Sequence, residues 1–450
     1  MKKDTSLFLI NLATLVLGLD YLWNLFPGLP AFFSLSRFVF LGVFFADLLL
    51  YPGKYLRSEY IYIACGLIIV GCMPFLLLEG DVFGENIVSQ VIKLWGIFAY
   101  LIFFYFNCSD AKTARRICTI LFLSSGVMAI YVIGSQLEIF GNKIDRWRGA
   151  VQFTSASGIF DPNLIAVYFL PVFAFGPLVK YRWKNMSGKM INLVVVLYIC
   201  VCFAAFFQLN TRSGSLAVAA CMIAALTLRF LIIPRQERGG RLNAILFLAI
   251  VVASLVYVQV QYNILESIIG IYEETDLSTD SSFAARRAAY NYLLKDLFSS
   301  PDLLGGGYHA YWKESGWSGF WPHCVFVDVY IKGGVIFLLT YLILFIGSVV
   351  ISLKKAFSGE DLIRRSCFAG FFCFMVGLLP LAATLSIGNK KLPWAIMGCI
   401  FGLAAGSRNK KMKEIKDGTE NKTNYNSGDC DPQPTGRANP GNPLGLYSED

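Results

Sequence analysis

Residues 324–352 read CVFVDVYIKGGVIFLLTYLILFIGSVVIS, an apolar run with one acidic and one basic residue, Asp328 and Lys332. A helix needs about 20 such residues to cross roughly 30 Å of hydrocarbon. The run therefore predicts a transmembrane helix. A strand of a membrane β-barrel would alternate apolar and polar residues instead, and lipid cannot satisfy the backbone of any open structure.

Apolar runs of similar length recur along the chain. The sequence of 450 residues is 56% apolar and has a mean hydropathy of +0.57, which is too apolar for a soluble globular protein of this size. We expect an all-α integral membrane protein whose membrane domain covers residues 1–406. Twelve transmembrane helices are predicted, at residues 6–26, 31–50, 59–78, 87–106, 117–137, 160–179, 190–208, 213–233, 242–260, 324–352, 363–385 and 392–406.

The placement of Lys and Arg predicts the orientation of these helices. With a cytoplasmic N-terminus, the cytoplasmic segments hold 26 of the 39 basic residues, as the positive-inside rule requires. Both termini are then cytoplasmic, and residues 261–322 form one large extracytoplasmic loop between the ninth and tenth spans. The net charge of +9 follows from this topology, so a nucleic-acid partner is not expected. Residues 407–450 turn polar and predict a disordered cytoplasmic tail.

The large loop contains a predicted helix that carries two adjacent arginines. Asp280-Ser281-Ser282 can cap the helix and Pro301 ends it. One face is apolar at helical spacing, with Arg286 and Arg287 on its two flanks, so the helix is amphipathic and could lie on the bilayer surface. The residues of that face are Phe283, Tyr290, Leu294 and Leu297.

The remainder of the loop is rich in glycine and aromatic residues. Gly305-Gly306-Gly307 allows positive φ and a close approach of the backbone to a ligand. The Tyr and Trp side chains that follow are typical of anchors at the membrane interface, and could also offer flat faces to a sugar ring. The two histidines of the chain, His309 and His323, lie in and just after this loop, and their spacing makes a poor zinc site.

Several basic residues break the positive-inside pattern, among them Arg37, Lys332, Lys390 and Lys391. Most can extend toward the headgroups or form surface ion pairs. Arg212 is different, because it opens the eighth predicted span, where a guanidinium is costly unless it is paired or hydrated. Arg212 is therefore a candidate functional residue, and Arg146 and Arg148 are further basic residues on the same predicted side.

Four motifs, taken in order, resemble those of the O-antigen ligase and polymerase family of bacterial envelopes, over roughly residues 150–345. They are Gly158-Ile159-Phe160-Asp161-Pro162-Asn163, then Thr211-Arg212-Ser213-Gly214, then Arg286-x3-Tyr290-x10-Pro301, and His323 followed by Gly334. Tyr290 stands where the family usually has Trp. Cys324 and Val325 stand where the family often has a polar residue after the histidine. The choice between ligase and polymerase stays open.

The resemblance implies a function at the outer face of the bacterial cytoplasmic membrane. Members of the family transfer a glycan from a polyprenyl-pyrophosphate carrier to an acceptor hydroxyl, on the lipid A core for ligases or on another carrier-linked repeat unit for polymerases. The partners implied are this donor, a glycan or lipid-linked acceptor, membrane lipid and proteins of envelope polysaccharide assembly.

The residues suit that chemistry without a metal or another cofactor. His323, with an ordinary pKa of about 6.5, is the expected general base. Arg212 and Arg286 are expected to hold the pyrophosphate, because guanidinium groups bind phosphate oxygens bidentately. Further candidates for substrate binding are Arg287, Arg146, Arg148, Asp161 and Asn163, the last two as groups that orient the site.

Three other interpretations stay open. His323 could cap the tenth span as a structural residue. The protein could be a transporter of polysaccharide or of a small solute, although no paired halves are visible and acidic residues within spans are nearly limited to Asp20, Asp47 and Asp328. It could also be a non-catalytic scaffold or sensor.

Overall fold

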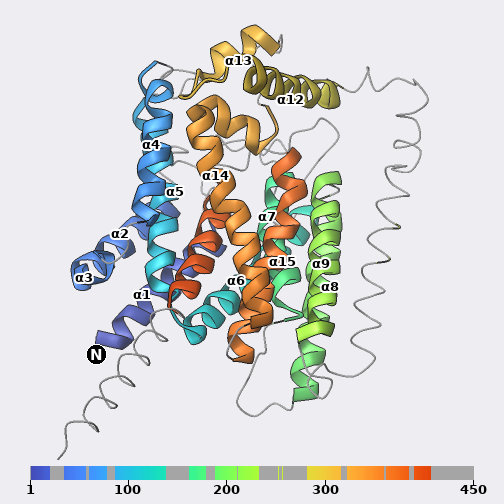
Figure 1. The fold of residues 1–450 in the computed structure, drawn as a ribbon. Coiled ribbons are helices and arrows are strands. Elements are labelled where there is room, and N and C mark those ends of the chain that lie inside the picture. Colours follow the sequence, from blue (N-terminus) through green and yellow to red (C-terminus); the bar gives the residue numbers. More distant parts are fainter. Residues whose placement is uncertain are drawn as a thin grey trace, which may run out of the picture. The chain divides into compact units, whose positions relative to one another are not determined.

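The structure is a computed structural model that describes most of the apolar part of the chain. The described residues are 2–20, 35–56, 60–78, 87–137, 162–178, 188–209, 211–232, 252, 256, 281–315, 322–358, 361–384 and 390–406. All regular secondary structure in these residues is helical (Figure 1).

Ten predicted spans each overlap a helix, most with bounds that agree within about four residues. The helices are α1 (Lys2–Gly18), α2 (Leu35–Leu50), α4 (Tyr60–Leu78), α5 (Ile87–Asn107), α6 (Ala111–Gln136), α7 (Pro162–Phe175), α8 (Gly188–Gln208), α9 (Arg212–Ile232), α15 (Leu362–Thr384) and the unlabelled helix Lys391–Gly406. However, α1 ends at Gly18, eight residues before the predicted limit, and α6 begins six residues before its predicted start. An eleventh span falls in α14 (Val325–Ser358), and α3 (Pro52–Tyr55) is one short turn. The predicted span 242–260 and the predicted tail lie outside the described residues, apart from positions 252 and 256.

Four of these helices are long and apolar enough to cross a membrane by length and composition. They are Ala111–Gly134, Ser213–Ile232, Val325–Ser358 and Leu362–Thr384, and six shorter apolar helices accompany them. Large apolar side chains point outward from the long helices, such as Ile343 at 71% exposure and Ile130 at 65%. A lipid-facing surface has this composition, so the described helices are consistent with a multi-pass membrane protein.

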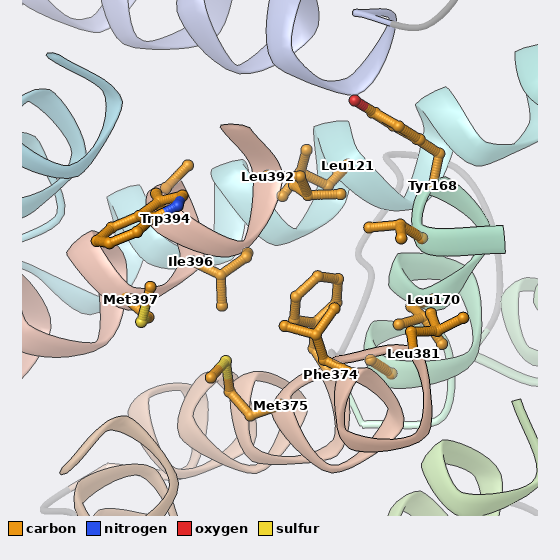
Figure 2. Close-up of a cluster of buried hydrophobic side chains, with 14 of the residues drawn as sticks. Leu121, Tyr168, Leu170, Phe374, Met375, Leu381, Leu392, Trp394, Ile396 and Met397 are labelled. Atoms are coloured by element: carbon orange, nitrogen blue, oxygen red, sulfur yellow. The ribbon is translucent and has the colours of Figure 1, made fainter. Parts of the chain in front are cut away.

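Small residues let α7, α9 and α15 pack closely. A Cβ added to Gly377 of α15 would lie 2.8 Å from the Cβ of Cys221 and 3.0 Å from the carbonyl oxygen of Ala217, both in α9. Close approach through glycine is typical of helix pairs in membranes. Phe374 and Met375 of α15 then face Leu170 of α7 and the apolar side of helix Lys391–Gly406 (Figure 2).

α14 is two helical pieces joined by a sharp reversal, so the prediction of one continuous span over 324–352 is wrong. Gly333 and Gly334 have non-helical backbone angles, and φ of Gly334 is +59°. The ring centroids of Phe326 and Tyr341 are 6.2 Å apart. Fifteen residues of straight helix would separate them by about 22 Å. Residues 325–332 therefore fold back beside the second piece.

The backbone groups freed at this reversal are satisfied by an inserted loop. The amides of Val335 and Ile336 donate to the carbonyl oxygens of Asp302 and Leu303 at 2.9 and 3.3 Å, and the Gly305 amide donates to Gly71 of α4 at 3.2 Å. Irregular backbone within an apolar layer is tolerated where protein surrounds it in this way. Gly305 approaches the backbone of Lys332: a Cβ on Gly305 would lie 2.2 Å from the Lys332 carbonyl group. The close approach predicted for this glycine is therefore made to protein backbone and not to a ligand.

We expect Gly334→Ala to destabilise the protein by about 2–3 kcal/mol, because the new Cβ would meet two carbonyl oxygens at 2.5 Å and φ is positive. Gly42→Ala in α2 is the matched control. A Cβ there has nothing within 4 Å, and the change should be neutral or slightly stabilising. Thermal unfolding of both variants in detergent measures the difference, and equal melting temperatures would contradict the described reversal.

Candidate active site

The segment 281–315, which we call the cap, lies across the ends of α4 and α14 (Figure 1). It contains α12 (Ser281–Ser299) and α13 (Gly307–Ser315). The predicted helix before Pro301 is therefore present, but its predicted apolar face is partly wrong. Leu294 is 51% exposed, while Ala289, Tyr292 and Leu293 are buried. Protein neighbours decide this face, since the Tyr292 ring packs at 5.2 Å on Tyr311 of α13.

Tyr290 connects the cap to two other parts of the chain. Its hydroxyl donates to the carbonyl oxygen of Ala383 near the end of α15 at 2.8 Å and accepts from the Cys324 thiol at 3.2 Å. Burial, followed by the Cys324 contact, raises the pKa of Tyr290, and the nearby Arg286 charge opposes the rise. Arg286 is half-buried one turn away, whereas Arg287 is exposed. The contact thus brings Arg286 and the residue after His323 to one place.

His323 has an uncommon backbone conformation. Its φ is +46°, in the left-handed region, and its side chain is half-buried between Pro322 and the start of α14. A non-glycine residue in that region is uncommon, and such residues cluster at functional sites. His309 by contrast is exposed, and its ring lies edge-on to Trp312 at 5.5 Å.

Two motif-bearing helices begin beside each other at this end of the bundle. A Cβ on Gly214 of α9 would lie 3.0 Å from the Cβ of Ala166 in α7. Asn163 precedes Ala166 by one turn, so the starts of α7 and α9 are adjacent. Both helix N-termini carry partial positive charge, which favours a bound anion.

The register between α9 and α15 places Arg212 at the level of the Tyr290 contact. Gly377 of α15 faces Ala217 of α9, and the two helices run antiparallel. Arg212 lies five residues from Ala217, and Ala383 lies six residues from Gly377. These offsets are about 7.5 and 9 Å along the helices. The backbones of Arg212 and Ala383 are therefore at nearly the same height.

Thr211 lies immediately before α9, and no role was predicted for its hydroxyl. The residue is 1% exposed, and its Oγ1 has no hydrogen-bond partner among the described residues. Buried hydroxyls are rarely left unpaired. An unsatisfied hydroxyl at a helix N-terminus is a group that a bound anion would satisfy.

The side chains of five predicted site residues are not among those that the structure describes. Asp161, Arg146 and Arg148 lie outside the described residues, and for Asn163 and Arg212 the described part is the backbone. Within the described ranges, no group of three or more His, Cys, Asp or Glu side chains could hold a metal ion.

A buried ion pair supports the folded-back piece of α14. Lys332 donates to Asp328 at 2.8 Å, and both side chains are buried. The Tyr308 hydroxyl of α13 also donates to Asp328, and the Lys332 ammonium lies 5.9 Å from the Tyr308 ring centroid. From the sequence, Lys332 was expected on or near the outer side of the membrane. The structure instead makes it part of the link between α13 and the segment that begins at His323.

A second acidic group flanks the inserted loop. Tyr330 of α14 donates its hydroxyl to Asp296 of α12 and accepts from the Asp302 amide at 3.1 Å. Partial burial raises the pKa of the Asp302 carboxyl, and the charges of Asp296 and Glu314 raise it further. These contacts fix the loop whose carbonyl oxygens cap the second piece of α14.

The chain matches no known protein family and no curated protein in sequence comparisons. The resemblance to envelope ligases and polymerases therefore rests on the four sequence motifs alone.

Asp328→Asn should destabilise the protein by about 3–5 kcal/mol, because it leaves the Lys332 ammonium buried without its counter-charge. Asp328→Leu combined with Lys332→Met removes both charges and should restore most of that loss. Melting temperatures of the two variants in detergent report the difference. If the double variant is as unstable as the single one, charge burial does not explain the pair.

Proposed function

We propose that the protein is a bacterial inner-membrane glycosyltransferase of the O-antigen ligase or polymerase type. It transfers a glycan from a polyprenyl-pyrophosphate carrier to an acceptor hydroxyl at the outer face of the membrane. The observation that carries the proposal is the Tyr290 contact. It joins the helix of Arg286 to the residue after His323, at the end of the bundle where α7 and α9 begin.

The chemistry follows from these groups. His323 accepts the proton of the acceptor hydroxyl, and the oxygen of that hydroxyl attacks the anomeric carbon of the donor sugar. The bond from that carbon to the pyrophosphate oxygen breaks, and the carrier leaves as its pyrophosphate. Arg212 and Arg286, with the N-termini of α7 and α9, neutralise the charge that develops on the leaving group. Arg287, Arg146, Arg148, Asp161 and Asn163 are further candidates to bind or orient the substrates.

The proposal includes the topology that brings carrier and acceptor to the cap. Twelve spans with both termini in the cytoplasm place residues 261–322 outside, where the lipid-linked glycan is presented. The four long apolar helices and the six shorter ones are consistent with this arrangement.

The transporter alternative is less well supported. It would use acidic residues within the helices for ion coupling, and all three candidates are engaged by lysines. Asp20 pairs with Lys391, Asp47 with Lys54, and Asp328 with Lys332. The scaffold or sensor alternative assigns no role to Arg212 and Arg286, so it expects their Arg→Gln variants to keep the wild-type phenotype.

His323→Ala should lower transfer by about 10²–10⁴-fold, the usual contribution of a general base. Arg212→Gln and Arg286→Gln should lower it as well, because they remove charge stabilisation of the leaving group. The assay is transfer by purified, reconstituted protein from a lipid-linked glycan to acceptor at equal protein abundance. His309→Gln is the matched control and should keep full activity. Wild-type activity in His323→Ala and Arg212→Gln would exclude this mechanism.

The surface glycans of a deletion strain separate the two members of the family. Unattached long chains indicate a ligase, because polymerisation continues without attachment. Single repeat units indicate a polymerase. An unchanged glycan profile would contradict both.

A further inference from the structure

A second cluster of buried polar side chains lies where α1 ends and two other helices begin. Lys391 and Ser36 both donate to one oxygen of Asp20, and the Tyr168 hydroxyl donates to the other at 3.2 Å. Lys391 Nζ also lies 3.2 Å from the Ser36 hydroxyl. Figure 2 shows the Tyr168 hydroxyl pointing out of the apolar cluster around Phe374.

Two helix N-termini meet at this cluster inside the protein. α2 has 16 residues, and Lys391–Gly406 is likewise among the shorter apolar helices. Sixteen residues span about 24 Å, less than the roughly 30 Å of a bilayer core. Ser36 and Lys391, in the first turns, are 0% and 6% exposed. Short helices whose N-termini point into a membrane protein are typical of anion sites.

The charges of the described residues at the cluster suit an anion. Asp20 is negative, Lys391 and the nearby Arg37 are positive, and the helix N-termini add partial positive charge. Arg37 and Lys390, the sequence neighbours of Ser36 and Lys391, are half-exposed. Arg37, Lys390 and Lys391 are also among the basic residues that break the positive-inside pattern, and the proposed function does not use them.

A buried hydroxyl at the cluster has no hydrogen-bond partner in the described part of the chain. Tyr100 of α5 is 1% exposed, and its hydroxyl has no hydrogen bond among the described residues. The hydroxyl lies within electrostatic range of Asp20 and Arg37, and Lys391 Nζ is 5.8 Å from the ring centroid. Buried polar groups are normally satisfied by protein, water or a ligand. This hydroxyl is therefore a donor available to a ligand oxygen.

A chain of aromatic contacts links the cluster to the segment that begins at His323. The Phe326 ring, beside Cys324, packs on Tyr341 at 6.2 Å, and Tyr341 packs on Trp394 at 5.7 Å. Trp394 follows Lys391 by one helical turn. Two aromatic contacts thus separate the His323 segment from the second cluster.

We propose that Lys391, Tyr100, Ser36 and Arg37 form a second anion site, which binds the diphosphate headgroup of a second isoprenoid carrier. This inference rests on the proposed function. A reaction that joins two carrier-linked glycans needs two diphosphate sites, one for the donor carrier and one for the acceptor carrier. Transfer to a lipid A core needs one. The second site therefore favours the polymerase, with Asp20 as the counter-charge that holds Lys391 when the site is empty.

The test is the stoichiometry with which purified protein in detergent binds radiolabelled farnesyl diphosphate. Wild-type protein should bind two equivalents. Asp20→Asn combined with Lys391→Gln removes both charges of the buried pair together, which avoids leaving one unpaired, and should bind one. Arg212→Gln combined with Arg286→Gln should also bind one. Competition with inorganic pyrophosphate and with farnesol shows whether the headgroup or the tail is recognised, and pyrophosphate should compete.

Tyr100→Phe gives a second test that does not depend on the ion pair. The variant loses a hydroxyl that has no hydrogen bond to any described residue, so a purely structural role predicts no change. A ligand role predicts about tenfold weaker binding of one equivalent. Tyr105→Phe, in the same helix, is the matched control and should bind as wild type.

The outcomes separate this inference from the proposed function. Suppose that wild-type protein binds one equivalent of farnesyl diphosphate. If the Arg212→Gln, Arg286→Gln variant loses this equivalent and Tyr100→Phe does not affect it, the second site is overturned and the proposed function stays intact. One equivalent that is lost only with Asp20 and Lys391 supports the second site and overturns the proposed active site. Competition by farnesol alone overturns the diphosphate as ligand.

Discussion

The structure depends on the cost of leaving a charge or a backbone group unsatisfied among apolar side chains. The three aspartates that are buried among the described residues show how such a charge is compensated. Asp20, Asp47 and Asp328 each hold a lysine, and each receives further hydrogen bonds from hydroxyl or amide groups. The backbone at the Gly333–Gly334 reversal is satisfied in the same way. Two amides that lose their helical partners there donate hydrogen bonds to carbonyl oxygens of the cap. Removing one member of such a set leaves the other without compensation.

These constraints also hold together the segments that carry the proposed chemistry. Because the cap supplies the carbonyl oxygens at the α14 reversal, the cap and the His323 segment cannot move independently. The Asp328–Lys332 pair and Tyr308 add a second connection, and the Tyr290 hydroxyl ties both to the end of α15. A rigid support of this kind is what a general base and a phosphate-binding arginine need if they are to meet the same substrate.

The sequence predicted the helices well and their mutual contacts poorly. The limits of α4, α5, α8 and α15 follow from apolar length, which is a local property, and α12 follows from its cap and Pro301. The reversal of α14 was missed, because two glycines in an apolar run are also compatible with a continuous helix. The buried face of α12 differs from the predicted one, because the side chains that cover it, Tyr311 and Tyr330, belong to other segments.

The site shows the same division. Motif order made Arg212, Arg286 and His323 candidates, but nothing local indicated that Tyr290 would join two of their segments. The partnership of Asp20 with Lys391 spans 371 residues, so no spacing rule could find it. The sequence did indicate that Lys391 is unusual, because it breaks the positive-inside pattern beside the start of a predicted span. It did not indicate that Asp20 is its partner.

The claim on which the function depends is that the cap faces away from the cytoplasm. The direct measurement is labelling of a His309→Cys variant in spheroplasts with a membrane-impermeant maleimide, with the site of labelling read by mass spectrometry. His309 is exposed, and its replacement leaves the proposed chemistry untouched. Labelling at position 309 in intact spheroplasts, with Cys430 of the tail labelled only after permeabilisation, is the expected result. Labelling at position 309 only after permeabilisation would contradict the proposed function, since the carrier-linked glycan and the site would then be on opposite sides of the membrane.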